Sequence, residues 1–123
     1  MKIKQCYLLV ITLLTSLTIS ATQTVSGIDI PFSYAKGQVL FEQYCSSCHG
    51  TDLNGSDKGP PLLHPYYKPS HHGDEAFYRA ALKGVRAHHW NFGDMPAVIG
   101  MTTKKMDSIV PYVRYFQQQK KLY

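Results

Sequence analysis

The sequence has few of the features that define several common classes of protein. It holds only three cysteines in 123 residues, an odd number that cannot form a disulfide framework. It has no uninterrupted apolar run of about 20 residues, the length that a transmembrane helix needs. Charged residues make up only 17% of the chain, too few for a disordered polyelectrolyte. One small globular domain remains, because domains usually hold about 100–200 residues.

Chemical motifs of enzymes are also missing. The chain shows no phosphate-binding loop, no Ser/His/Asp-type set and no second copy of the cysteine motif described below. It also lacks a basic run with interleaved aromatic residues, the pattern expected of a nucleic-acid-binding surface. We therefore expect neither an independent enzyme nor a nucleic-acid-binding protein.

The N-terminal segment has the pattern of a secretory signal peptide. Lys2 and Lys4 form a basic start, a largely apolar stretch follows from Cys6 to Ile19, and the small residues Ser20 and Ala21 come after it. We expect residues 1–21 to be removed on export to the periplasm. The alternative is an uncleaved segment that anchors the protein to the membrane.

Cleavage after residue 21 changes the composition of the mature chain. It removes two lysines and one cysteine, which lowers the formal net charge from +5 to +3 and leaves Cys45 and Cys48. We divide the rest into an N-terminal extension, residues 22–33, and a main domain, residues 34–123. The extension contains Ile28, Ile30 and Phe32, which suggests a docking arm.

The two remaining cysteines lie in the most informative motif, Cys45-Ser46-Ser47-Cys48-His49. Cys-x-x-Cys-His is the attachment sequence for c-type haem. Two intervening residues suit two vinyl groups on one porphyrin edge, and the histidine that follows is directed at the iron. The motif therefore predicts one covalently bound haem c.

Three other interpretations of the cysteine pair were weighed. A zinc site needs two further ligands, which the pairs His71-His72 and His88-His89 offer. A thioredoxin-like redox motif needs a βαβ context that is absent from the sequence. A structural disulfide leaves His49 without a role.

Haem iron in cytochromes c is usually held by histidine on one side and methionine on the other. Met95 is the favoured sixth ligand because Pro96 follows it and blocks a helix, which suits a ligand on a rigid loop. Met101 is the second candidate. Met106 falls on the apolar face of the last expected helix, where a core position is more natural.

Helical periodicity appears in three segments. The first precedes the cysteine motif and contains Gly37, which has no Cβ and allows close helix crossing, with Tyr112 as the expected partner. The second runs from Asp74 to Lys83 and ends before a glycine. The last has an apolar face formed by Met106, Ile109, Val110, Val113 and Phe116. Pro111 lies inside it and predicts a kink or a late helix start.

Residues after the cysteine motif also have expected contacts. The turn Gly59-Pro60-Pro61 is suited to present the Pro60 carbonyl to the ring N–H of His49. His71 and His72 are expected in an exposed loop. His88 and His89 are expected to flank Trp90 and reach solvent or a haem propionate, with copper or zinc binding as the alternative.

Together these motifs resemble the class I cytochrome c family, in particular its small bacterial monohaem members. The resemblance covers roughly residues 34–118 and includes the run from His88 to Pro96. It implies an all-α cytochrome c fold in which three to four short helices wrap around one covalent haem. It further implies thioether bonds at Cys45 and Cys48, with axial iron ligation by His49 and Met95. Pro60 would then orient the histidine, and Trp90 would lie near the haem propionates.

The resulting functional hypothesis is an exported carrier of single electrons between periplasmic redox proteins. The basic mature chain favours acidic docking surfaces on the electron donor and acceptor. One alternative is a haem-bearing subunit of a larger oxidoreductase. Another is a sensor with a labile sixth ligand, which would bind carbon monoxide readily in its reduced form.

Overall fold

The computed structural model describes residues 24, 25 and 27–123, so the expected signal peptide lies outside the described residues. Within them, helices dominate, as expected for an all-α fold. The elements in chain order are β1 (Thr24–Val25), β2 (Ile28–Asp29), η1 (Phe32–Tyr34), α1 (Ala35–Tyr44), α2 (Ser46–His49), η2 (Pro65–Tyr67), α3 (Asp74–Lys83) and α4 (Thr103–Gln119).

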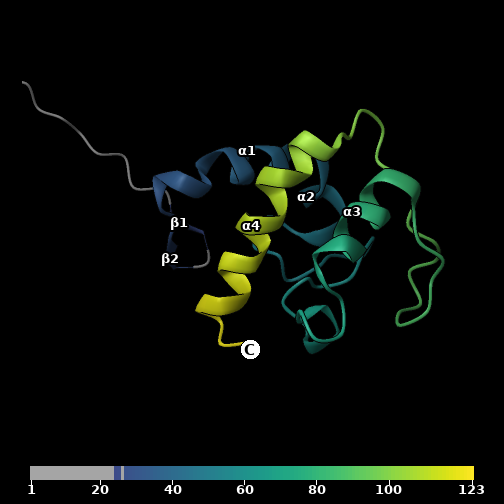
Figure 1. Ribbon diagram of the computed structural model, residues 1–123. Helices are drawn as coiled ribbons and strands as arrows, with labels where there is room; N and C mark the ends of the chain where they lie inside the picture. The colour runs from purple at the N-terminus through teal and green to yellow at the C-terminus, as the bar shows by residue number, and fades with distance from the viewer. Residues whose placement is uncertain (1–23, 26) are drawn as a thin grey trace, which may run out of the picture.

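The N-terminal and C-terminal helices form the centre of the fold. Helix α1 packs against α4 more extensively than any other two elements pack, and α3 lies against another part of α4 (Figure 1). A Cβ at Gly37 would overlap the Ser108 carbonyl oxygen and lie 2.7 Å from the Cβ of Tyr112. The rings of Phe41 and Tyr112 meet close by, with centroids 5.6 Å apart. The close crossing predicted for Gly37 is therefore confirmed.

Helix α4 begins at Thr103, directly after its N-cap residue Thr102, whose side chain accepts a hydrogen bond from the Lys105 amide. Its predicted apolar face is confirmed, because all five residues of that face are buried. The late start predicted from Pro111 is wrong. The helix continues through Pro111, which lies on the exposed side, while buried residues on the opposite face hold the turns before and after it to the core.

Helix α3 has the bounds predicted from the sequence. Asp74 and Glu75 lie in its first turn, where carboxylates interact favourably with the helix dipole, and Gly84 ends it with φ of +81°. A Cβ at Gly84 would lie 2.8 Å from the Met95 carbonyl oxygen. Glycine is needed here both for the positive φ and for the close approach of the loop that joins α3 to α4.

The described part of the N-terminal extension packs on the domain itself. Strands β1 and β2 pair antiparallel, and the Tyr115 hydroxyl donates to the Asp29 carbonyl at 2.7 Å. Ile30 is buried in the core and Ile28 packs against the core. The prediction that this extension forms a docking arm is therefore wrong for these two isoleucines. Phe32, in contrast, is 94% exposed.

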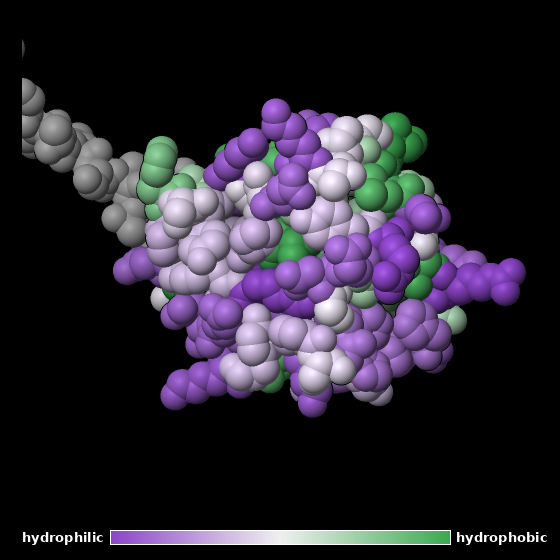
Figure 2. Space-filling view, viewed as in Figure 1, coloured by the Kyte–Doolittle hydropathy of each residue, from purple (hydrophilic) through white to green (hydrophobic). Residues whose placement is uncertain are grey.

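The surface is mainly hydrophilic on the face seen in Figure 2, with apolar colour gathered where the α3–α4 loop meets the start of α4. Ile99, in that loop, is 94% exposed. Among the described residues, no helix combines the length and the hydrophobicity required to cross a membrane.

Candidate functional site

A mainly apolar cavity of about 630 Å³ lies between α2, α3, α4 and the α3–α4 loop. Its volume falls within the range of about 300–1,000 Å³ that is typical of cofactor pockets. Apolar side chains from all parts of the fold line it, among them Leu62, Phe77, Val85, Ile109 and Val113. The helices and the loop therefore border a mainly apolar space that is large enough for a cofactor.

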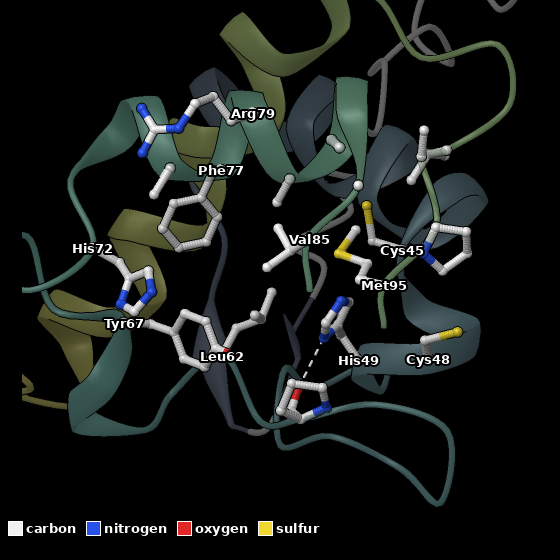
Figure 3. Close-up of a pocket in the computed structure, with 18 of the residues that line it drawn as sticks. Cys45, Cys48, His49, Leu62, Tyr67, His72, Phe77, Arg79, Val85 and Met95 are labelled. Carbon is white, nitrogen blue, oxygen red and sulfur yellow. Dashed lines mark hydrogen bonds between the residues drawn. The ribbon is translucent and has the colours of Figure 1, made fainter. Parts of the chain in front are cut away.

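His49 ends the short helix α2 and reaches the cavity. It is only 9% exposed, and its Nδ1 donates to the Pro60 carbonyl oxygen at 2.9 Å, the dashed line in Figure 3. Because a carbonyl only accepts, Nδ1 bears the ring proton and Nε2 has a free lone pair. Burial lowers the pKa of His49, although the Pro60 carbonyl opposes this change. The lowered pKa favours the neutral imidazole, the form that ligates metals, and the contact predicted for Pro60 is present.

Cys45 is the N-cap residue of α2 and Cys48 lies within that helix, both line the same cavity, and no disulfide joins them. Burial, together with the neighbouring Cys48, raises the pKa of Cys45 to about 12. Reactive redox cysteines have a lowered pKa, so this environment does not favour the thioredoxin-like alternative. A Cβ at Gly59 would lie 2.9 Å from the Cys48 carbonyl oxygen, which shows how closely the Gly59-Pro60 turn packs beneath α2.

Met95 enters the cavity from the α3–α4 loop (Figure 3). Two backbone hydrogen bonds join it to Val85: Met95 N–H donates to the Val85 carbonyl at 2.8 Å, and Val85 N–H donates back at 2.9 Å. Met106 also lines the cavity but is buried on the core face of α4, whereas Met101 is not among the lining residues. The geometry therefore favours Met95 over Met101 as a donor to a bound group.

Trp90 lies in the segment closed by the Val85–Met95 pair and also lines the cavity. Its indole Nε1 is buried and has no hydrogen-bond partner among the described residues. An unsatisfied buried donor costs about 1–3 kcal/mol. A bound group with acceptor oxygens would satisfy it, as a haem propionate does. Two thiols, a free imidazole nitrogen, a thioether and this donor together fit a covalently attached haem.

The alternative zinc site at the cysteines does not form in this fold. Figure 3 places His72 on the far side of the cavity from Cys45 and Cys48. His72 is half-buried and lines the cavity, so the expectation of an exposed position is wrong for this residue; His71 is exposed as expected. His88 and His89 line the cavity beside Trp90.

An all-helical domain with a Cys-x-x-Cys-His helix beside an apolar cavity defines a haem-binding class of protein. In agreement, residues 34–117 match the family model for cytochrome c, and the chain belongs to the cytochrome c family. It is thus an electron-transfer haem protein with the all-α cytochrome c fold, from a family that binds haem c covalently and generally acts as an electron carrier. Searches of curated proteins and of solved structures gave no match.

Sequence reasoning did not identify a buried polar network that supports one wall of the cavity. Arg114, only 8% exposed, donates to the Tyr67 carbonyl at 2.6 Å, to the His72 carbonyl at 2.6 Å and to the Asp74 carboxylate at 2.7 Å. Gln117 donates to the Leu62 carbonyl at 2.8 Å. The single sequence signal was that Arg114 is the only charged residue between positions 107 and 120.

Replacing Arg114 with methionine is expected to lower the free energy of unfolding by about 3 kcal/mol, because the His72 carbonyl and the buried Gln117 Oε1 lose their donor. The ion pair itself contributes little, since the Asp74 side chain is 62% exposed. Chemical denaturation of the purified protein measures the loss. Lys104→Met, at an exposed position of the same helix, is the control and should change stability by less than about 0.5 kcal/mol. Equal effects of both substitutions would show that the network is not stabilising.

Proposed function

We propose that this protein is an exported carrier that holds one haem c and transfers single electrons between periplasmic redox partners. The observation that supports it most is the convergence of His49, Met95 and Cys45 on one apolar cavity from separate elements (Figure 3). Bound haem supplies a one-electron iron couple. Such a carrier needs no substrate site, only a cofactor near the surface and a docking face.

Each residue of the site has a role under this proposal. Cys45 and Cys48 would hold the haem through two thioether bonds, and His49 Nε2 and Met95 Sδ would supply ligands to its iron. The Pro60 carbonyl keeps the His49 ring in the tautomer and orientation that ligation requires. Trp90 Nε1 would donate to a propionate. The apolar lining excludes water, and methionine as the sixth ligand raises the reduction potential relative to a second histidine.

Partner recognition is proposed from charge and exposure. The mature chain has a formal net charge of +3, which favours partners with acidic surfaces and makes their association sensitive to salt. Two apolar residues near the cavity, Phe92 at 42% and Ile99 at 94% exposure, offer a contact area beside the Met95 segment. An acidic protein with a small apolar centre to its docking surface fits this face.

A second candidate function is a permanently bound haem subunit of a larger oxidoreductase. The exposure of Phe32, 94% beside an otherwise packed extension, favours it, because a stable partner would cover such a side chain. Co-purification with a partner at high salt supports this function, while a monomeric protein under the same conditions supports the free carrier.

Haem content tests the proposal directly. Protein matured with the haem-attachment machinery is expected to give a c-type pyridine haemochrome with one haem per chain. The double variant Cys45→Ser/Cys48→Ser should retain no haem after denaturing extraction, because only the thioether bonds resist it. A Ser46→Ala/Ser47→Ala control changes the two intervening residues and should keep one haem. A wild-type haem that can be extracted, or a different stoichiometry, would contradict the proposal.

A further inference from the structure

Four histidines from two distant segments meet at the mouth of the cavity. We call His71, His72, His88 and His89 the histidine cluster. One ring nitrogen from each of His71, His72 and His89 lies within 4.8 Å of the others. The Nε2 atoms of His71 and His89 are 3.2 Å apart, and those of His72 and His88 are 3.5 Å apart. One member of the cluster, His72, lies across the cavity from the iron-ligand candidates His49 and Met95 (Figure 3).

The hydrogen bonds of the cluster leave lone pairs directed at one another. His72 Nδ1 donates to the Tyr66 carbonyl, and His88 Nδ1 donates to the Arg86 carbonyl at 2.8 Å. Because carbonyls only accept, both rings bear their proton on Nδ1 when neutral. Their Nε2 lone pairs then face each other at 3.5 Å, an arrangement that is repulsive unless a cation lies between them. Metal-ligating histidines typically donate their other N–H to a carbonyl in this way.

Both segments that bear the cluster are held in place by the fold. Arg114 donates to the His72 carbonyl at 2.6 Å and so ties the first segment to α4. The Val85–Met95 pair closes the second segment, and the Asp94 carboxylate accepts from the Ala87 amide at 2.8 Å within it. A site whose ligands are positioned by a rigid scaffold loses little conformational entropy when it binds a metal ion.

The 3.2 Å between His71 and His89 matches two ligands that share one ion, and the ring nitrogen of His72 lies within 4.8 Å of both. Two imidazole nitrogens, each about 2.0–2.1 Å from a tetrahedral metal, lie about 3.3 Å apart. Imidazole suits zinc and copper, whereas calcium and magnesium prefer oxygen ligands. We propose that His71, His72 and His89 bind one divalent transition-metal ion, with His88 beside it as a weaker fourth donor. The Irving–Williams order predicts tighter binding of Cu²⁺ than of Zn²⁺.

Metal titration of the haem-loaded protein tests this site. After treatment with a chelator, the protein is expected to bind one Cu²⁺ or one Zn²⁺ per chain in calorimetry, with Cu²⁺ tighter. The Cu²⁺ complex should show hyperfine coupling to several imidazole nitrogens in electron paramagnetic resonance. Substituting either His71→Gln or His89→Gln should weaken binding about 100-fold, and His88→Gln about tenfold, while the haem spectrum confirms that each variant is folded.

The matched control is His64→Asn. His64 caps η2 by accepting from the Tyr66 amide, a role that asparagine also fills, and it lies outside the proposed ligand set. This variant should bind metal as the wild type does. Three outcomes would overturn the proposal: no stoichiometric binding, binding that survives in both His71→Gln and His89→Gln, or equal weakening in His64→Asn. The first would mean that a shared proton occupies the space between the rings, and the second that the ion binds elsewhere.

Discussion

Replacing Met95 with alanine is expected to abolish the weak absorption band of the ferric methionine–iron bond and to lower the midpoint potential. Without the Met95 side chain, the iron would take water or another protein group as its ligand. Axial ligands set haem potentials over a range of roughly 0.8 V. We expect the loss of the methionine ligand to lower the midpoint potential by an amount on the order of 0.1 V, which lies within that range. Absorption spectroscopy and redox titration of the variant measure the two changes.

The control for this prediction is Met101→Ala. Met101 lies only six residues further along the chain but does not line the cavity. This variant should keep the band and the potential of the wild type. If the band is lost in Met101→Ala and kept in Met95→Ala, the assignment of the sixth ligand is wrong. If both variants keep it, a residue other than these two methionines ligates the iron.

A second large effect is expected for Gly37→Ala, where two physical arguments predict opposite changes in the free energy of unfolding. Helix propensity alone predicts a gain of about 1 kcal/mol, since alanine is favoured over glycine inside a helix. The new Cβ, however, would overlap the Ser108 carbonyl oxygen of α4 and crowd Tyr112, and both contacts are with parts of the chain that cannot swing away. Overpacking of this kind typically costs 1–3 kcal/mol, and backbone contact places it at the upper end.

We therefore expect a net loss of about 2 kcal/mol, which lowers the melting temperature by roughly 10 °C in a domain of this size. Thermal denaturation of the haem-loaded protein measures it. Gly73→Ala is the matched control, because the nearest atom to its Cβ would be the Pro69 carbonyl oxygen at an ordinary 3.8 Å. Its effect should stay below about 1 kcal/mol. A stabilising effect at Gly37 would mean that α1 and α4 separate at little cost.

Several features of the protein follow from short stretches of sequence. The haem-attachment motif spans five consecutive residues, Cys45 to His49, so its cysteines and histidine are near one another in the chain itself. Helix α3 was predicted with its observed bounds because two acidic residues lie in its first turn and Gly84 follows its last residue. The buried face of α4 follows from a repeat of three to four residues. Each of these signals acts over one helical turn.

The late helix start predicted from Pro111 was wrong because helix propensity is a local preference. Packing of α4 against α1 and α3 outweighs it, since the residues on either side of Pro111 are buried against those helices. The choice between Met95 and Met101 likewise depends on how Val85 pairs with the loop, ten residues earlier in the chain.

By itself, the sequence determined the haem-attachment motif and the helical class, because these depend on neighbouring residues. Only the tertiary structure decided the buried partners of Arg114, more than 40 positions away in two cases, and the meeting of His71 with His89. Nothing in the sequence around either histidine pair indicates that the two pairs meet in space. Their contact exists because the α3–α4 loop folds back over the cavity and the Arg114 network holds the opposite wall against α4.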